Sequence, residues 1–376
     1  MRIIFVCGAG IVSGKERQTF ATILQLRKLG HEVFCIMASW GSNEFELMLQ
    51  RAGVPYRKLR LGFISKTLKF SAIMMTLHQL VYIPSLWWRY SSLVKRYRPE
   101  VVLHTNFHHL FLLFPVLGGP KNVFYVHDYF YPSIFYKWLF KLFQKKVNLF
   151  IGVSDFINRS LTPLGVPSEK TATVYNGVKF SNQVNSKAIK DNHDSLIRVA
   201  IVGQVGEWKG HGVLFRAIAP LLKERTDVEL HIIGEGNEKY VSELKDWVIQ
   251  ERISSQIKFR GRLSSLPEIY ESIDVVCVPS LIKESFGLTA LEPAFFSIPV
   301  ICSDTGALPE IVTHSVTGLV VSSNNTKELE DALRFLILHP EKREMMGKAA
   351  HERANNLFTI EKSTSVLVSH LSDLLK

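Results

Sequence analysis

The sequence predicts an α/β protein built from two doubly wound, Rossmann-like domains. Short apolar runs alternate with helical patterns along the whole chain, which is typical of parallel sheets with helices on their faces. The chain has 376 residues, more than one ordinary hydrophobic core accommodates. A polar stretch at residues 181–195 interrupts the alternation, and we interpret it as the linker between the domains.

Residues 1–180 form the predicted N-terminal domain. A helix is expected at residues 15–29, because apolar residues recur there at helical spacing and Gly30 closes the pattern. The expected strands are the apolar runs at residues 2–7, 31–37, 100–106, 122–128, 148–154 and 171–177.

Residues 196–357 form the predicted C-terminal domain, and we expect the last helix, residues 358–376, to pack back on the N-terminal domain. Ligands of doubly wound sheets bind outside the carboxyl ends of the strands, so two such domains facing each other would form a central cleft. The expected strands are residues 197–203, 228–234, 257–261, 274–280, 298–304 and 317–323, and the expected helices include residues 210–223, 326–338 and 341–356.

The composition favours anionic partners and a reducing compartment. Lys and Arg number 45 against 34 Asp and Glu, a formal net charge of +11, which suits phosphates, nucleic acid or an acidic membrane surface. No nucleic-acid-binding module is recognisable, so nucleic acid is not expected. Cys7, Cys35, Cys277 and Cys302 lie in apolar runs without a C-x-x-C pair, which indicates buried free thiols. Neither a signal peptide nor a membrane-spanning run is expected.

A glycine-rich loop, Gly8 to Gly14, follows the first strand and allows a dinucleotide-binding interpretation. A NAD site also needs an acidic residue at the end of the second strand, where this chain has Ala38 and Ser39. A nicotinamide enzyme is therefore disfavoured. The alternatives are a tight turn between strand and helix, or a flexible loop that closes on a ligand.

A second glycine-containing loop, VGQVGEWKG at residues 202–210, opens the C-terminal domain. Lys209 stands at the start of a helix, where a cation opposes the helix dipole unless an anion binds there. Phosphate is the natural anion, held by backbone N–H groups and the lysine charge. The alternative is a solvated surface lysine.

The stretch KESFGLTALEPAFF at residues 283–296 follows the strand at residues 274–280. Residues 285–289 are expected to begin a helix whose free N–H groups face a ligand, with Gly287 allowing a diphosphate to approach. Glu284 would reach sugar hydroxyls, and Glu292, roughly two turns up a helix over residues 288–296, would hold the paired hydroxyls of a ribose. If Glu292 is buried among the apolar residues of this helix, it needs a polar partner.

These residues resemble the GT-B glycosyltransferases of family 4, a retaining group. The resemblance spans almost the whole chain and is strongest over residues 284–312, where the family pattern is E-x-F-G-x-x-x-x-E, then a helix of small residues, PV and PE. YNGV at residues 175–178 and SGKERQ at residues 13–18, which is similar to the family's Gly-Gly-x-Glu loop, add to it, as does the loop at residues 202–210. Before the PV, this chain has Phe295, Phe296 and Ser297 where small residues and glycine are usual.

The resemblance implies a nucleotide-sugar donor site in the C-terminal domain and an acceptor site in the N-terminal domain. It implies that Glu284 contacts the donor sugar, that Glu292 contacts the ribose, that Lys209 neutralises the distal phosphate, and that Gly14 closes over this phosphate from the other domain. The residues expected to bind the donor are Gly14, Gln204, Lys209, Arg262, Ser285, Phe286, Gly287, Leu288, Thr289 and Glu292.

The chain departs from the family pattern at Gln204, where the family typically has Arg. The exchange removes one positive charge from the environment of the leaving group. Either a nearby cation replaces it, with Arg260 and Arg262 as candidates, or the activity is weak or lost.

His127 ends the strand at residues 122–128. A lone histidine at a strand end is more often structural, but the resemblance implies that His127 reaches the donor sugar near the reacting carbon. We therefore predict His127 and Glu284 as the catalytic residues. Asp128 would orient the imidazole or approach the acceptor, and Lys15 and Glu16 are the other expected acceptor-binding residues.

The sequence contains no D-x-D triad and no His, Cys or Asp cluster with metal-ligand spacing. We therefore expect neither a metal nor another cofactor. Lys209 and helix dipoles would stabilise the departing diphosphate.

Two segments of the N-terminal domain, residues 70–98 and 129–146, combine basic and aromatic residues. Trp and Tyr prefer the interface of a membrane, and Lys and Arg prefer anionic lipid. The alternative is that both segments are ordinary amphipathic helices packed on the sheet. We predict a cytoplasmic protein that lies peripherally on the inner face of an anionic membrane.

The predicted function is metal-independent, retaining transfer of a hexose or N-acetylhexosamine from a nucleoside-diphosphate sugar, with UDP favoured over GDP. The predicted acceptor is a hydroxyl of a lipid-linked or surface glycan. The alternatives are a sugar-nucleotide epimerase or phosphorylase on the same fold, and a non-catalytic homologue that binds a glycan or a partner.

Overall fold

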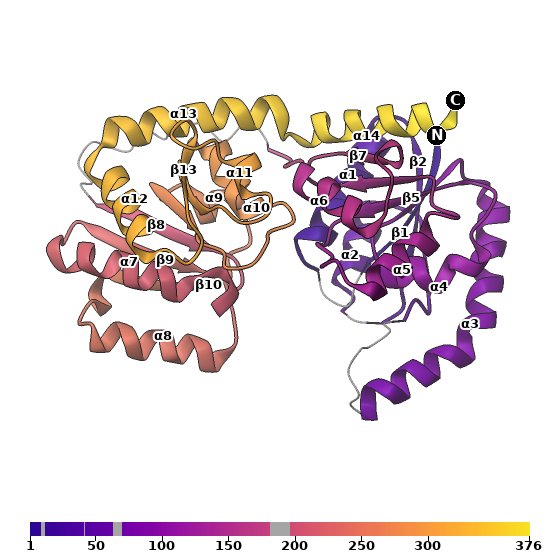
Figure 1. Cartoon of the computed structure of the whole chain (residues 1–376), viewed down its shortest axis with the longest axis horizontal. Helices are drawn as coiled ribbons and strands as arrows, with labels where there is room; N and C mark the ends of the chain where they lie inside the picture. The colour runs from indigo at the N-terminus through magenta and orange to yellow at the C-terminus, as the bar shows by residue number, and fades with distance from the viewer. Residues whose placement is uncertain (9–11, 41, 63–69, 181–195) are drawn as a thin grey trace. The chain divides into compact units, whose positions relative to one another are not determined.

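The computed structural model describes residues 1–8, 12–40, 42–62, 70–180 and 196–376, with the backbone alone for residues 70–80. These residues divide into unit 1, Met1–Lys179 with Ile360–Lys376, and unit 2, Phe180–Thr359 (Figure 1). Each unit is built on a parallel sheet, so the predicted α/β class with two doubly wound domains is confirmed. The predicted linker at residues 181–195 lies outside the described residues, and the predicted central cleft stays a prediction.

The sheet of unit 1 has the strand order β3-β2-β1-β4-β5-β6-β7, and each neighbouring pair is parallel. Its central strands are buried on both faces, as apolar runs between two layers of helices should be. The strands are β1 (Arg2–Cys7), β2 (Glu32–Ala38), β3 (Tyr56–Leu59), β4 (Val101–His104), β5 (Lys121–Val126), β6 (Leu149–Gly152) and β7 (Thr171–Thr173).

Local capping sets the ends of several helices in unit 1. Helix α1 follows Ser13 and stops before Gly30, whose φ of +83° suits the left-handed end of a helix. Ser154 caps α6 by accepting a 3.1 Å hydrogen bond from the Ile157 N–H. The helices are α1 (Gly14–Lys28), α2 (Glu44–Arg51), α3 (Phe70–Tyr97), α4 (Phe107–Leu113), α5 (Ile134–Phe143), α6 (Asp155–Leu161) and α14 (Ile360–Leu375), with the 3-10 turns η1 (Phe114–Val116), η2 (Thr162–Leu164) and η3 (Ser168–Lys170).

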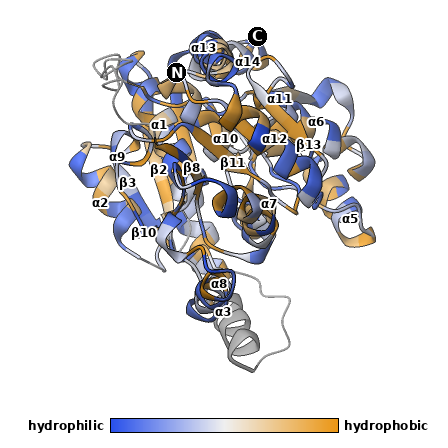
Figure 2. Cartoon of the chain, turned by 90° about the vertical axis from the view of Figure 1, so that its left-hand side faces the viewer, coloured by the Kyte–Doolittle hydropathy of each residue, from blue (hydrophilic) through white to orange (hydrophobic). Residues whose placement is uncertain are grey.

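The sheet of unit 2 has the strand order β10-β9-β8-β11-β12-β13, again with parallel neighbours. Hydrophobic residues concentrate on its strands and on the helix faces that cover them (Figure 2). The strands are β8 (Ile197–Val202), β9 (Val228–Ile233), β10 (Ile257–Gly261), β11 (Val275–Val278), β12 (Val300–Ser303) and β13 (Gly318–Val321).

The helices of unit 2 alternate with these strands. Helices α7 and α12 pack against each other, and α13 packs on the turn η6. The helices are α7 (His211–Glu224), α8 (Glu238–Gln250), α9 (Leu266–Tyr270), α10 (Leu288–Leu291), α11 (Leu308–Ile311), α12 (Thr326–Leu338) and α13 (Pro340–Leu357), with the 3-10 turns η4 (Glu207–Lys209), η5 (Ser254–Gln256) and η6 (Glu292–Phe296).

Every predicted strand is present, although most end earlier than predicted because the chain turns at their polar carboxyl ends. The run at residues 171–177, for example, pairs only over Thr171–Thr173. The strand β3 was not predicted. Its sequence, YRKL, is mostly polar and it lies at the edge of the sheet, so it lacks the apolar pattern of a buried strand.

Helix α14 packs in unit 1, against α1. The Ile360 N–H donates a 3.1 Å hydrogen bond to the Val178 carbonyl, and the Ser363 hydroxyl donates a 2.6 Å bond to the Tyr175 carbonyl. Leu367 and Leu371 are fully buried. The last helix therefore belongs to the core of unit 1 although unit 2 precedes it in the sequence.

The cysteines and the helix lengths bear on two further predictions. Cys7, Cys35, Cys277 and Cys302 are buried free thiols, as predicted, and burial raises the pKa of Cys277 and Cys302. No helix in the described ranges combines the length and apolar character needed to cross a bilayer.

We predict that Leu367→Ala destabilises the protein by about 2–5 kcal/mol, because it removes a fully buried side chain between α14 and α1. The neighbouring Val366 is 44% exposed, so Val366→Ala is the matched control and should change stability by less than about 0.5 kcal/mol. Urea unfolding followed by circular dichroism measures both. Equal effects would show that α14 is not part of the core of unit 1.

Candidate functional site

The winding of the sheet in unit 2 reverses between β8 and β11. The chain runs from β8 outward through β9 to β10, then returns to place β11 on the other side of β8. The loops that follow two such strands diverge at the carboxyl edge, and this is where open α/β sheets bind ligands. The loop after β8 carries Gln204 and Lys209, and the loop after β11 carries Glu284 and Gly287.

An ion pair joins these two loops. The Lys209 Nζ lies 2.6 Å from Glu284 Oε1, and the two side chains are only 24% and 16% exposed. The hydroxyl of Ser280, a fully buried residue, donates a 2.6 Å hydrogen bond to the same oxygen. Both contacts therefore fix Oε1 of Glu284 and leave Oε2 outside them.

The backbone around Glu284 is held by side-chain hydroxyls and by close packing. The Ser280 carbonyl accepts hydrogen bonds from the hydroxyls of Ser303 at 2.7 Å and Ser323 at 3.2 Å. The Ala307 N–H donates a 2.9 Å bond to the Glu284 carbonyl. Gly306 has a φ of +63°, and a Cβ there would lie 2.2 Å from the Glu284 carbonyl oxygen, so only glycine fits.

The helix after β11 begins where the sequence predicted, but it is shorter. Gly287, with a φ of +97°, is the N-cap, and α10 runs only from Leu288 to Leu291. Pro293 cannot donate to the ladder of an α-helix, and the chain continues as the 3-10 turn η6. Glu292 therefore lies about one turn beyond the helix start, and the prediction that it lies two turns up a helix over residues 288–296 was wrong.

The other predicted donor residues of this loop lie around the start of α10. Ser285 and Phe286 precede the N-cap, and Thr289 is in the first turn, where backbone N–H groups lack intrahelical partners. Phe286 is buried and its ring lies 6.1 Å from that of Phe358. Its side chain therefore anchors the loop in the core while its backbone stays at the edge of the sheet.

Glu292 has the polar partner that its apolar surroundings require. The Tyr270 hydroxyl donates a 2.9 Å hydrogen bond to Glu292 Oε2, and Tyr270 is fully buried. Burial and the nearby carboxylate raise the pKa of Tyr270, so the phenol stays protonated and donates. Tyr270 was not among the predicted site residues, because it lies on α9 and nothing in its local sequence points to Glu292.

The loop after β8 approaches β11 closely. Gly210, with a φ of +77°, is the N-cap of α7, and a Cβ there would lie 1.9 Å from the Pro279 carbonyl oxygen. His211 Nδ1 lies 3.1 Å from the Gly206 carbonyl oxygen, and burial lowers the pKa of His211 to about 4, so the ring is neutral. His211 was not among the predicted site residues. Its contact with Gly206 fixes the loop that carries Lys209.

Gln204 stands where the family has arginine, and Arg260 and Arg262 are the cations predicted to replace that arginine. Gln204 is exposed, so a longer side chain has room at that position. Arg260 Nη1 lies 3.3 Å from His231 Nδ1, and β10, which carries Arg260, is the edge strand of the sheet. Arg262 follows the end of β10 and is exposed. Both predicted candidates are therefore exposed, and the choice between them stays a prediction.

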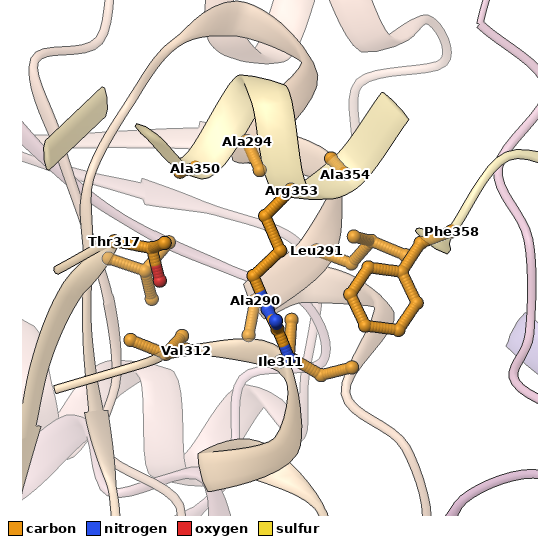
Figure 3. Close-up of a pocket in the computed structure, with 11 residues that line it drawn as sticks. Ala290, Leu291, Ala294, Ile311, Val312, Thr317, Ala350, Arg353, Ala354 and Phe358 are labelled. Carbon is orange, nitrogen blue, oxygen red and sulfur yellow. The ribbon is translucent and has the colours of Figure 1, made fainter. Parts of the chain in front are cut away.

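A small pocket between α10, α11 and α13 lies under these loops (Figure 3). Its lining is apolar apart from Thr317 and Arg353, so it does not offer the polar groups that a nucleotide needs. Arg353 Nη2 donates a 2.8 Å hydrogen bond to the Glu310 carbonyl. This bond ties α13 to α11, the helix that begins directly after Ala307, whose N–H binds the Glu284 carbonyl.

In unit 1, the predicted catalytic histidine is buried and neutral. The Nε2 of His127 has no hydrogen-bond partner among the described residues. Burial, and then the charge of Lys15, lowers the pKa of His127 to about 3. Asp128 forms an ion pair with Lys15 at 3.4 Å. The roles predicted for His127 and Asp128 toward a substrate stay predictions.

The first loop of unit 1 leads into α1. Gly14 is the first residue of the helix and is exposed. The Glu16 carboxylate accepts hydrogen bonds from the Ser13 N–H at 3.0 Å and from the Ser13 hydroxyl, so Glu16 caps the helix. This structural task adds to the predicted acceptor contact, which stays a prediction. Residues 9–11 of the loop lie outside the described residues.

Within the described ranges, no group of three or more His, Cys, Asp or Glu side chains could hold a metal ion. The predicted metal independence stays a prediction.

Two family models match the sequence along both units. The model described as Glycosyltransferase Family 4 matches residues 12–181, and the model described as Glycosyl transferases group 1 matches residues 183–353. The chain is 34% identical over 164 residues to a D-inositol 3-phosphate glycosyltransferase of Corynebacterium diphtheriae, which covers 42% of this chain and 38% of that protein. It is 31% identical over 170 residues to an uncharacterised glycosyltransferase of Methanocaldococcus jannaschii, covering 42% and 43% of the two chains. The chain thus spans about two fifths of the length of these relatives.

Solved structures are similar over nearly the whole chain. Anabaena HepE in complex with UDP has a TM-score of 0.81 at 18% identity and covers 99% of this chain and 100% of its own. A glycosyltransferase from Rickettsia africae has a TM-score of 0.82 at 19% identity, covering 100% and 98%. These likenesses identify the fold as GT-B.

We predict that Gly306→Ala costs about 2–5 kcal/mol, since it combines a left-handed backbone with a collision against the Glu284 carbonyl. Gly30 has a similar φ of +83° with nothing within 4 Å of a Cβ, so Gly30→Ala is the control and should cost only about 1–2 kcal/mol. Equal losses in urea unfolding would mean that the packing of Gly306 on Glu284 does not constrain the loop.

Proposed function

Since the chain belongs to the group 1 glycosyltransferases of family 4, we propose that it transfers a hexose or N-acetylhexosamine from a nucleoside-diphosphate sugar to an acceptor hydroxyl. One observation carries the proposal: Lys209 and Glu284, from the loops on either side of the reversal between β8 and β11, meet in a partly buried ion pair. The pair brings a cation and a carboxylate to the edge where a donor would bind. UDP is the favoured nucleotide of the donor, with support from the UDP complex of Anabaena HepE.

Glu284 is assigned to the donor sugar. Oε1 is occupied by Lys209 and Ser280, so Oε2 is the atom available to accept hydrogen bonds from sugar hydroxyls. Removing Glu284 would therefore remove sugar contacts without removing the loop that holds it.

Lys209 and the start of α10 are assigned to the diphosphate. Lys209 carries three N–H donors, and the contact with Glu284 uses one of them. The N–H groups around Gly287 supply further donors at a positive helix end. Arg262 is the proposed additional cation in place of the arginine that Gln204 replaces.

Glu292 is assigned to the ribose. Its Oε2 accepts from the Tyr270 hydroxyl, which fixes the carboxylate without neutralising it. A charged carboxylate forms strong paired hydrogen bonds with vicinal hydroxyls.

We propose that the reaction retains the anomeric configuration and proceeds without a metal. The departing phosphate would take the proton of the incoming hydroxyl while the sugar passes through an oxocarbenium-like state. Lys209 and the N–H groups at the start of α10 would stabilise the charge that develops on the phosphate. A neutral His127, as its lowered pKa implies, would act as a hydrogen-bonding group rather than as a cation.

Acceptor binding is assigned to unit 1, with Lys15, Glu16 and Asp128 as contacts and Gly14 as part of the loop that closes over the donor. The proposed acceptor is a lipid-linked or surface glycan, used in polysaccharide biosynthesis at the inner face of an anionic membrane. The relatives named as D-inositol 3-phosphate glycosyltransferases support a second acceptor class, a phosphorylated cyclitol. The ion pair of Lys15 with Asp128 suits either class, because it presents both a cation and a hydroxyl-binding carboxylate.

A non-catalytic homologue that binds a glycan or a partner is the second candidate, favoured by the missing charge at Gln204. Slow release of UDP from a UDP-sugar in the absence of acceptor would exclude it. An epimerase would instead convert the donor without releasing UDP.

We expect Glu284→Ala to nearly abolish sugar transfer while free UDP binds as tightly as before, because the substitution removes sugar contacts but frees Lys209 for phosphate. Glu292→Ala should instead weaken UDP binding by about 10- to 100-fold. Calorimetric titration with UDP and a transfer assay in excess chelator measure both effects. Glu238→Ala, at an exposed position of α8, is the control. Unchanged UDP affinity in Glu292→Ala would contradict the ribose assignment, and transfer that stops on chelation would contradict metal independence.

Gln204→Arg should tighten UDP binding or raise the transfer rate by roughly 10- to 100-fold, since one charge-assisted contact contributes about 1.5–3 kcal/mol. Gln250→Arg adds the same charge at an exposed position on α8 and should leave both quantities unchanged. A loss of activity in Gln204→Arg would show that the pocket has been rebuilt around glutamine.

A further inference from the structure

Helix α5 of unit 1 has two apolar faces, and among the described residues only one of them is buried. Leu139, Phe140 and Phe143 are buried. The Phe140 ring lies 5.2 Å from Phe130 and 6.0 Å from Phe150, inside the core. This face docks α5 on the sheet and accounts for the ordinary packing of an α/β helix.

The second face is exposed at the start of the helix and in the turn before it. Ile134 is 90% exposed, Tyr131 63%, Trp138 53% and Phe135 46%. These residues fall within eight positions of one another, and the rings of Phe135 and Trp138 lie 6.3 Å apart. We call them the α5 patch. Single exposed apolar residues are normal on a protein surface, but a cluster of four indicates a site that contacts another protein or a membrane.

The charged residues that follow the start of the α5 patch in the sequence are basic. Lys137, Lys141 and Lys145 are exposed, and residues 129–154 contain no Asp or Glu. Asp128, three positions before Tyr131, is paired with Lys15. Ile134, Trp138 and Lys141 follow one another at intervals of three or four residues, so they share one stripe of α5, and Lys145 lies two residues beyond the end of the helix. The stripe is apolar in its first turns and basic toward its end.

We propose that the α5 patch is the element that inserts into an anionic lipid surface, with Ile134, Phe135, Trp138 and Tyr131 in the interface and Lys137, Lys141 and Lys145 at the head groups. Aromatic residues favour the level of the head groups, and lysines nearby are attracted to anionic lipid. The inference rests on the proposed use of a membrane surface and names the part of the chain that makes it.

The other basic and aromatic segment, in α3, exposes fewer large apolar side chains among those described. Within the described side chains, Val81 and Trp88 are its strongly exposed large apolar residues, seven positions apart. The Trp87 indole N–H donates a 2.8 Å hydrogen bond to the Leu112 carbonyl, and Leu86 and Tyr90 are buried, so this part of α3 packs on unit 1. Lys146 is also engaged, because its Nζ donates a 2.9 Å bond to the Pro115 carbonyl.

The test is co-flotation of the full chain with phosphatidylcholine vesicles, with and without phosphatidylglycerol. The wild type should bind only the anionic vesicles and be released by salt. The triple variant Ile134→Ser, Phe135→Ser, Trp138→Ser should lower the partition coefficient at least about tenfold. Neutralising Lys137, Lys141 and Lys145 to Gln should lower it by roughly 100-fold at low salt.

Matched controls assign the effect to this patch. Ile249→Ser, at a 65% exposed isoleucine of α8, and Trp88→Ser should bind as the wild type does. Trp138→Phe, which keeps an apolar ring, should bind normally but lose the part of the tryptophan quenching by brominated lipid that comes from Trp138. If the triple variant fails to fold by circular dichroism, this quenching still decides the question.

The outcomes separate the two proposals. Wild-type binding that depends on Trp88, or that survives in both α5 variants, would overturn the assignment of α5 while leaving membrane contact in place. No binding to anionic vesicles at low salt, equal binding to neutral vesicles, or self-association that the triple variant abolishes would overturn the membrane contact itself. UDP affinity, measured on the same variants, should be unchanged in every case, so a failure of the donor site is seen independently.

Discussion

The contact of Glu284 with Lys209 and Ser280 is the constraint around which the loops of unit 2 are arranged. A partly buried carboxylate is stable only if charge and hydrogen bonds replace the water it loses. Lys209 supplies the charge and Ser280 supplies a neutral donor, both to the same oxygen. The two loops approach closely, and Gly210 lies on Pro279 with no space for a Cβ. The loop after β12 packs as closely, with Gly306 on the backbone of Glu284.

The two carboxylates of the candidate site have different hydrogen-bond partners. Glu284 is paired with a cation, Lys209, and accepts a second hydrogen bond from Ser280. Glu292 accepts from the phenol of Tyr270, which stays protonated because burial and the carboxylate raise its pKa. The protein therefore fixes the orientation of each carboxylate through side chains that lie far from it in the sequence.

The fold was largely predictable because the strands of a parallel sheet are continuous apolar runs. The run DVVCVPS predicted β11, and IRVAIVG predicted β8, with errors of at most two residues at the ends. The polar edge strand β3 gave no such signal. Pro293 did give a signal for the end of α10, because proline removes the N–H that the next turn of a helix needs, but the apolar run around it suggested a longer helix.

The site was predictable in its residues but not in its contacts. Glu284, Gly287 and Lys209 follow strands, and sheet topology alone brings such positions to one edge. The pairing of Lys209 with Glu284 spans 75 residues, and that of Tyr270 with Glu292 joins two separate helical segments. Such pairs depend on side-chain packing, which no local pattern encodes. His211 was missed for the same reason, since its link to the Gly206 carbonyl appears only once the loop has folded.

The same distinction applies to α5. Its sequence, IFYKWLFKLF, has apolar residues on every side, and periodicity cannot tell which of them a sheet will cover. Burial of Leu139, Phe140 and Phe143 uses one face and leaves Ile134 and Trp138 on another. An ordinary surface helix would have polar residues at those positions, because exposed aromatic clusters promote association. Their presence beside three exposed lysines, in a stretch at residues 129–154 without Asp or Glu, is therefore a property that packing of the fold does not require, and it is better explained by contact with a negatively charged apolar interface.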